Sequence, residues 1–318
     1  MTYYKHQILL ICSPQRAGGN LLNRLFDSTE DCNSIHDELF LGSYHFTNDF
    51  LQNNKIQNKF LNFKNKNIRK IFKDLTFYNK RYLKFNGTWP KDSKSNIKFI
   101  FNHFLLKKIF FKLIKENNTN NLSKIINIYI HSYLKSISSY RYKEKKFCSF
   151  YKPNLSCSIQ NLKRYLKLFP DSKLIYISRD AKTWLYSSKE RYFNGKYKTD
   201  ISIKKYFENY WFKSLKNILI LKKKYPKNVF IINFKNLLTK KSTIKILSKE
   251  LGISYNFQNM TPTIYGRKTN ANSAFSSRRK PGINRNPINY KYFPKELNKI
   301  ISKKKYIKLY NDTKLIAF

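Results

Sequence analysis

The sequence predicts a three-layer α/β fold, in which a central parallel sheet lies between two layers of helices. Four apolar runs of strand length lie at residues 8–12, 147–151, 174–177 and 229–232. Short runs that are largely apolar are typical of strands buried on both faces of a sheet. Helical patterns alternate with these runs, and this alternation favours a parallel sheet with right-handed crossovers.

The predicted helices space their apolar residues three or four positions apart, which gives each helix one buried face. They lie at residues 20–27, 159–169, 183–193, 206–225 and 242–251. The last thirty or so residues predict one further basic helix and a tail.

Residues 45–145 interrupt this alternation with a stretch rich in Lys, Asn, Phe and Ile. We expect several basic amphipathic helices here, as an insertion within a single domain that spans residues 1–318. Ligands bind at the carboxyl end of such sheets, so the insertion is expected over that end, on the side of the substrate. A helical region that only completes the core is an equally good interpretation.

The charge is strongly unbalanced, with 64 Lys and Arg against 18 Asp and Glu, for a net charge of +46. A genome rich in A and T would favour lysine codons, but it would favour glutamate as well, and glutamate is scarce. Part of the positive field therefore indicates an anionic partner: nucleotide phosphates, nucleic acid or an acidic glycan.

The lengths of the apolar stretches and the spacing of the cysteines indicate where the protein is located and whether it binds a metal. No stretch has the length of a transmembrane helix, and residues 8–11 are too few for the core of a signal peptide, so we expect a cytoplasmic protein. The four cysteines, Cys12, Cys32, Cys148 and Cys157, lack the spacing of metal ligands. Buried free thiols and no bound metal are expected.

A glycine turn joins the first predicted strand to the first predicted helix, in the stretch "CSPQRAGGNLLNRLF" at residues 12–26. Backbone amides in such a turn, together with the positive end of the helix, bind anions. Gly18 and Gly19 permit the tight turn, Arg16 adds a charge, and Asn20 can cap the helix. A purely structural turn is the alternative.

The turn lacks two residues that a nucleoside-triphosphate loop requires. In the pattern GxxxxGK[ST], the lysine reaches the outer phosphates and the hydroxyl holds magnesium. Gly19 and Asn20 occupy these two positions. The loop therefore suits a ligand with a smaller anionic group and no metal.

A second strand-to-helix junction lies in "SKLIYISRDAKTWLYSSKERY" at residues 172–192. Arg179 ends the strand, and Ser187 follows within the next helix, so both could bind one phosphate. The alternative is that Arg179 and Asp180 pair with each other and Ser187 faces solvent.

Together these two motifs resemble those of the sulfotransferases that use 3′-phosphoadenosine 5′-phosphosulfate (PAPS). "PQRAGGNLL" is similar to the family's first loop, Pro-[Arg/Lys]-Ser-Gly-Thr-Thr, and "SRDAKTWLYS" to its Arg-Asp-Pro…Ser site. The resemblance implies the P-loop-like sulfotransferase architecture and PAPS as the donor. It also implies that Arg179 and Ser187 bind the 3′-phosphate, and that the first loop binds the 5′ end through Arg16, Ala17, Gly18, Gly19, Asn20 and Leu21. In this chain Ala17 and Gly19 replace hydroxyl residues, and Ala181 replaces the usual proline.

Three further stretches follow in the order of the family, so the resemblance covers residues 5–40 and about 145–285. "FPDSKLIYISRD" leads to the second motif, and "NVFIINFKNLL" carries Phe234 and Lys235 in place of a Tyr-Glu pair. Residues 261–283 look like the late loop that closes on the adenosine and the 3′-phosphate. There the candidates are Arg267, Lys268, Asn272 and Ser273, although such a loop could also be plain solvated surface.

Transfer of a sulfuryl group needs a base for the acceptor hydroxyl and cations for the developing charge. Glu38, in "NSIHDELFLG", is the favoured base, because members of the family that use glutamate place it at a comparable distance behind the loop. His36 is the alternative, with a pKa suited to neutral pH. Arg16 is the first candidate for charge stabilisation and Lys152, in "FYKPNL", is the second.

The sequence thus predicts a PAPS-dependent sulfotransferase. A hydroxyl of a glycan or glycolipid, such as an acidic saccharide, is the preferred acceptor, and a small alcohol or a peptide tyrosine remains open. The alternatives are a phosphate-loop kinase that uses ATP and a non-catalytic protein that binds polyanions. Nucleic acid is not expected as a specific partner, and the oligomeric state is left open.

Overall fold

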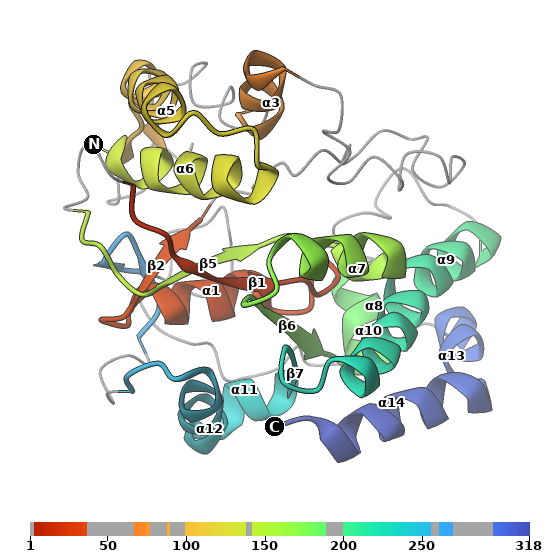
Figure 1. The fold of residues 1–318 in the computed structure, drawn as a ribbon. Helices are drawn as coiled ribbons and strands as arrows, with labels where there is room; N and C mark the ends of the chain where they lie inside the picture. Colours follow the sequence, from red (N-terminus) through yellow and green to blue (C-terminus); the bar gives the residue numbers. More distant parts are fainter. Residues whose placement is uncertain are drawn as a thin grey trace.

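The central sheet has five parallel strands in the order β2–β5–β1–β6–β7 (Figure 1). In the computed structural model, residues 3–36, 67–76, 88–89, 99–137, 142–188, 200–255, 261–269 and 295–318 are described. The register aligns Gln7 with Phe147, and Ile175 with Phe230. The strands are β1 (Gln7–Ile11), β2 (Cys32–Ile35), β5 (Phe147–Tyr151), β6 (Lys173–Ser178) and β7 (Val229–Asn233). All four apolar runs are therefore strands, as predicted.

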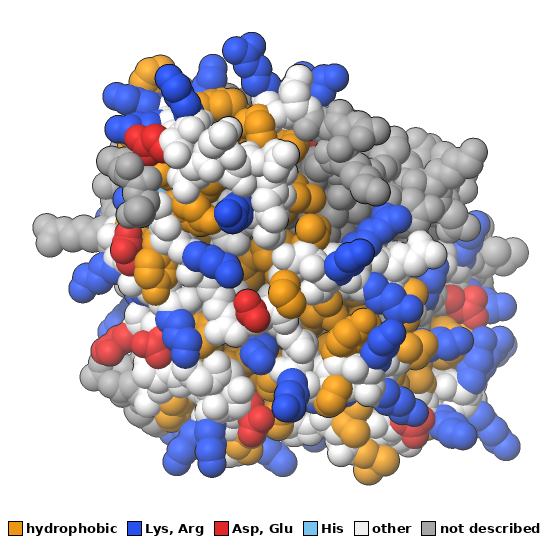
Figure 2. All heavy atoms as spheres, in the orientation of Figure 1, with side chains coloured by type: hydrophobic (Ala, Val, Ile, Leu, Met, Phe, Trp, Pro, Cys, Tyr) orange, Lys and Arg blue, Asp and Glu red, His pale blue; other side chains and the backbone are white. Residues whose placement is uncertain are grey.

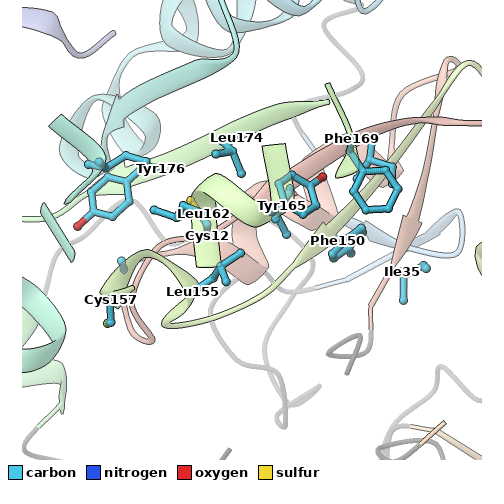
Figure 3. Packing of buried hydrophobic residues seen from close by; sticks show 14 of the residues in the cluster. Cys12, Ile35, Phe150, Leu155, Cys157, Leu162, Tyr165, Phe169, Leu174 and Tyr176 are labelled. Atoms are coloured by element: carbon cyan, nitrogen blue, oxygen red, sulfur yellow. The ribbon is translucent and has the colours of Figure 1, made fainter. Parts of the chain in front are cut away.

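Helices cover both faces of this sheet, which confirms the three layers. Successive residues of β1 point to opposite faces: Ile8 and Leu10 belong to one buried cluster, and Leu9 and Ile11 to the other. Figure 3 shows the first cluster, where the sheet residue Leu174 lies near Leu162 of a covering helix. The first face carries α6 (Leu122–Lys135), α7 (Ile159–Leu168) and α10 (Lys213–Lys224), and the second carries α1 (Gly19–Asp27), α11 (Phe234–Thr239) and α12 (Lys241–Leu251).

The described part of the predicted insertion contributes to the core of the first face. Every residue from 125 to 134 on α6 is buried. The Tyr129 hydroxyl donates to the Leu75 carbonyl at 3.2 Å, which ties α6 to α3 (Ile68–Leu75). The other elements of this region are β3 (Thr88–Trp89), β4 (Phe99–Ile100) and α5 (His103–Asn117), and the rest of it lies outside the described residues.

Two predicted helices differ from the observed ones. The stretch 206–225 is α9 (Asp200–Phe207), a π-helical segment (Glu208–Phe212) and then α10. The single basic helix expected near the end is two helices, α13 (Lys295–Ile301) and α14 (Lys304–Ile316), because Lys303 adopts an extended conformation between them.

Beyond α14, Phe318 pairs with the free edge of β7. Its amide donates to the Ile231 carbonyl at 3.1 Å, and its carbonyl accepts from the Asn233 amide at 3.2 Å. An exposed strand edge is a template for unwanted pairing, and Phe318 covers part of this one. No helix in the described ranges is long and apolar enough to cross a membrane.

Candidate functional site

The candidate site lies where the carboxyl ends of the parallel strands meet. His36 follows β2, Lys152 follows β5, the loop of residues 12–18 follows β1, Arg179 follows β6 and Phe234 follows β7. Because all five strands run in one direction, these residues share one edge of the sheet. Open α/β folds bind their ligands at this edge.

The loop after β1 is held by hydrogen bonds from both neighbouring strands. The Ser13 hydroxyl accepts from the Ile177 amide at 2.6 Å, and the Gln15 amide donates to the Asn154 side chain at 3.2 Å. Arg16 has φ 68° and Gly18 has φ 104°, so both are left-handed. A left-handed arginine costs about 1 kcal/mol, and these contacts hold it in place.

Both glycines of the turn are packed against aromatic rings. A Cβ on Gly18 would lie 2.6 Å from the ring of Phe234, and a Cβ on Gly19 would lie 2.3 Å from the ring of Tyr151. The Tyr151 hydroxyl donates to the Pro14 carbonyl at 3.0 Å, which pins its ring. The glycines are therefore required by close approach as well as by backbone conformation.

Helix α1 begins at Gly19 without a side-chain cap. Gly18 is the N-cap residue, and no side chain caps the helix there. The prediction that Asn20 caps the helix is wrong, because the helix starts one residue before it. The first-turn amides of Gly19, Asn20 and Leu21 are thus left to an anion or to water.

Arg179, at the end of β6, is fixed against this loop. Its Nη1 donates to the Arg16 carbonyl at 2.6 Å, and its Nε donates to the Thr183 hydroxyl at 3.0 Å. Its guanidinium lies 4.5 Å from the centre of the Phe234 ring, a cation–π contact. Trp211, in the π-helical segment, donates from Nε1 to the Arg179 carbonyl at 2.8 Å.

Ser187 is brought to the same place by α8 (Ala181–Ser188). Arg16 Nε donates to the Ser187 hydroxyl at 3.1 Å, and Ser187 is buried. Asp180 accepts from the Thr183 amide at 2.8 Å, so it caps α8. The structure therefore joins Arg16, Arg179 and Ser187, and it places the Asp180 carboxylate at the start of α8.

Lys152 lies beside the end of β1, where the loop of residues 12–18 begins. Its amide donates to the Ile11 carbonyl at 2.8 Å, and its side chain is fully buried. Burying an ammonium group is costly, so a lysine in this position indicates an environment with polar or anionic partners.

His36 is packed in a second polar cluster around Asp27, at the end of α1. His36 Nε2 lies 3.1 Å from Asp27 Oδ1, and Asp27 Oδ2 accepts from the Thr263 hydroxyl at 2.6 Å and the Gly266 amide at 2.9 Å. Burial raises the pKa of Asp27, but the contacts with His36, Thr263 and Gly266 outweigh it and lower the pKa below its usual value. Asp27 is therefore ionised at neutral pH. The ring of Tyr265 packs edge-on against His36, with 4.8 Å between ring centres.

The late loop is described only at its beginning. Thr263 and Gly266 belong to a hairpin of β8 (Thr263–Ile264) and β9 (Arg267–Lys268), and Asp27 anchors it to α1. The side chains of Arg267 and Lys268 are exposed. Three predicted site residues lie outside the described part of the chain: Glu38, Asn272 and Ser273.

Several residues that shape the site were missed from the sequence. Trp184 donates from Nε1 to the Gln15 carbonyl at 2.8 Å, in the way that Trp211 holds Arg179. Tyr151 and Phe234 pack on the two glycines. The sequence indicated Trp184 only by its place within the second motif. It could not predict which backbone carbonyl the indole N–H would bind.

Fold and site together define a three-layer α/β protein with a basic glycine turn at the carboxyl edge of its sheet. No family model matches the chain, and no curated protein matches it. Among solved structures, it is similar to the sulfotransferase domain from the curacin biosynthetic pathway, at 14% identity over 95% of this chain and 98% of that one, with a TM-score of 0.45.

Two further solved structures are similar to the chain. The sulfotransferase domain of the Synechococcus PCC 7002 olefin synthase is 12% identical over 98% of this chain and 96% of that one, with a TM-score of 0.46. A sulfotransferase from Alicyclobacillus acidocaldarius is 7% identical over 80% and 83%, with a TM-score of 0.45.

Proposed function

We propose that this chain is a sulfotransferase that moves a sulfuryl group from PAPS to a hydroxyl group, with a glycan or glycolipid as the preferred acceptor. One observation carries the proposal. Arg16 is hydrogen-bonded both to Arg179 and to Ser187, beside the uncapped start of α1. Two cations, a hydroxyl and free helix amides in one place suit a ligand with more than one anionic group.

The donor would be held at two points. Arg16 and the backbone of residues 17–21 suit its 5′ end, through charge and helix amides. Arg179 and Ser187 suit its 3′-phosphate, with Arg267, Lys268, Asn272 and Ser273 of the late loop as further ligands. A kinase would need a lysine and a hydroxyl where Gly19 and Asn20 stand, so the loop does not favour ATP with magnesium.

In the proposed reaction, the acceptor oxygen bonds to sulfur while the bond from sulfur to the 5′-phosphate oxygen breaks. The acceptor proton passes to Glu38 or His36. Nε2 of His36 lies 3.1 Å from Asp27 Oδ1, so Nδ1 is the ring nitrogen that would take the proton from the acceptor. Arg16 and Lys152 would stabilise the charge that develops on the leaving phosphate and the sulfonate.

We place this activity in a single domain of residues 1–318, with residues 45–145 on the acceptor side. All four cysteines are buried free thiols, which suits a reducing compartment, and we propose the cytoplasm.

Calorimetric titration with 3′-phosphoadenosine 5′-phosphate, beside ATP with magnesium, tests the donor site. We expect tight binding of the former alone, weakened roughly tenfold to a hundredfold in Arg179→Ala. Arg69→Ala removes an exposed arginine on α3 and serves as the matched control. Binding of neither nucleotide would refute the donor assignment, and binding of ATP alone would indicate a kinase. Transfer of labelled sulfate from PAPS to a panel of glycans, glycolipids, small alcohols and tyrosine peptides then identifies the acceptor.

A further inference from the structure

The outer face of α14 carries exposed aliphatic residues among lysines. Ile307 is 51% exposed and Leu315 is 85% exposed. Lys304, Lys308 and Lys314 are exposed on the same helix. These five positions are spaced so that they share one side of the helix, and we call them the α14 outer face.

The inner face of α14 is packed against the protein. Tyr306 is 1% exposed and donates its hydroxyl to Glu208 of the π-helical segment. The Tyr310 hydroxyl accepts from the Asn233 side chain at 3.2 Å, and Thr313 is fully buried. The aromatic residues of the helix therefore point inward together with Leu309, whereas Ile307, Leu315 and the lysines of the α14 outer face point to solvent.

The neighbouring helix has the same composition on its exposed side. On α10, which packs against α14, Ile220 is 44% exposed among the exposed Lys216, Lys223 and Lys224. Figure 2 shows lysine and hydrophobic side chains next to one another over these two helices. The chain thus presents aliphatic side chains to water where the positive charge is also high.

We propose that the α14 outer face docks on an anionic lipid bilayer. A helix that lies in a membrane interface combines apolar residues, which enter the boundary of the acyl chains, with lysines, which remain at the anionic headgroups. The net charge of +46 supplies the long-range attraction. Single-stranded nucleic acid would need exposed aromatic rings for stacking, whereas Tyr306 is buried and Tyr310 is half-buried.

Docking of α14 would bring the candidate site close to the lipid surface. Tyr310 contacts Asn233, the residue before Phe234, and its ring lies 6.3 Å from that of Trp211, which holds the Arg179 carbonyl. A substrate carried by the membrane would thus meet the protein on the side of this helix. The docking itself does not rest on the proposed activity, and its test does not measure activity.

Sedimentation with vesicles of phosphatidylcholine, alone or mixed with phosphatidylserine, tests the proposal on the full chain. We expect binding to the mixed vesicles only, and weaker binding as salt is raised. Replacing Lys304, Lys308 and Lys314 by glutamine should weaken partitioning by about fivefold per lysine. The double variant Ile307→Gln and Leu315→Gln should weaken it by about tenfold, through lost apolar burial.

Helix α5 provides the matched control, since it offers the same chemistry elsewhere on the molecule. Phe104 is 76% exposed there, and Lys107, Lys108 and Lys115 are exposed as well. Replacing these three lysines and Phe104 by glutamine should leave vesicle binding close to that of the parent protein. Equal loss in both sets, loss in the α5 set alone, or no binding to anionic vesicles would overturn the proposal. Binding to single-stranded DNA that depends on the α14 residues, without vesicle binding, would overturn it in favour of nucleic acid.

A fluorescent label at a single position shows directly which helix contacts the bilayer, without a variant that weakens binding to the vesicles. The four native cysteines are buried, so Leu315→Cys would carry the one accessible thiol among the described residues. An environment-sensitive dye at that position should shift to the blue with anionic vesicles, and the same dye in Phe104→Cys should not. A shift at Phe104→Cys alone would place the bilayer on the other helix and overturn the proposal.

Discussion

Replacing Gly19 by alanine sets helix propensity against packing. Gly19 is the first residue of α1 and its φ is not left-handed, so alanine fits the backbone. Alanine within a helix is favoured over glycine by up to about 1 kcal/mol. The added Cβ, however, would lie 2.3–2.6 Å from three atoms of the Tyr151 ring. That ring is 7% exposed and hydrogen-bonded to Pro14, so it cannot swing away freely.

The net effect follows from these two terms. Overpacking of a well-packed site costs about 1–3 kcal/mol. After the gain in propensity, we expect Gly19→Ala to lower the free energy of unfolding by roughly 1–2 kcal/mol. In the Tyr151→Leu background the ring is absent, and the same change should be neutral or stabilising by up to about 1 kcal/mol. The coupling between the two positions is therefore roughly 1–3 kcal/mol, which is the overpacking cost that the Tyr151→Leu background removes.

A double-mutant cycle by urea denaturation measures this coupling. All four proteins are compared at one pH, and unchanged m-values are required so that the differences report stability. The sign of the alanine effect should reverse between the two backgrounds. If Gly19→Ala has the same effect in both, Tyr151 does not limit this position and the explanation for the glycine is wrong.

Three further predictions concern the pH dependence of stability and the residues that hold the candidate site in position. Burial lowers the pKa of His6 from 6.5 to about 4, so the unfolded chain binds its proton at a higher pH than the folded one. The contribution of neutral His6 to the free energy of unfolding is therefore fully present above pH 6.5 and is lost as the pH falls towards 4, by roughly 3 kcal/mol. The urea midpoint of His6→Gln should depend less on pH over that window than the midpoint of the parent protein. Trp211→Phe keeps an aromatic ring but removes the indole N–H that donates to the Arg179 carbonyl. Binding of 3′-phosphoadenosine 5′-phosphate should therefore weaken by about three- to tenfold in calorimetry, and unchanged affinity would contradict a positioning role. Arg16→Gly should have a higher urea midpoint than Arg16→Ala, since both lose the hydrogen bond to Ser187 but only glycine relieves the left-handed backbone. Both variants should lose binding of the nucleotide, and a parent-like affinity in either would remove Arg16 from the site.

The sheet could be predicted because strands buried on both faces leave a simple trace. Four of the five strands are short apolar runs of this kind. The fifth, β2, contains the polar residues Asn33 and Ser34 and has no such pattern. The two breaks in the helices leave no such trace. The π-helical segment of 208–212 continues the apolar spacing of a regular helix, and the break at Lys303 falls among lysines, with no glycine or proline. Both lie beside tertiary contacts that only the structure shows, those of Trp211 with Arg179 and of Tyr306 with Glu208.

The candidate site was predictable only as far as its residues follow strands. Arg16, Arg179 and Lys152 each come directly after a strand or in its loop, so parallel topology alone brings them to one edge. The partner of His36 is different. Asp27 lies at the end of a helix, and its contacts with His36 and Thr263 join residues that no local pattern links. Contacts between side chains that are distant in the sequence can be identified only from the structure.

The left-handed backbone of Arg16 connects the stability of the loop with its proposed function. Glycine would adopt φ 68° without strain, and the chain already uses glycine two residues later at φ 104°. The arginine is held there by the hydrogen bond from Arg179 to its carbonyl and by two hydrogen bonds of the preceding Gln15. The Gln15 carbonyl accepts from Trp184, and the Gln15 amide donates to the Asn154 side chain. Three elements therefore fix a conformation that the side chain itself disfavours, and what they secure is the position of a guanidinium beside Ser187 and the start of α1. Strain of this kind concentrates where a side chain is used, and it makes Arg16 the residue on which the proposed donor site depends most.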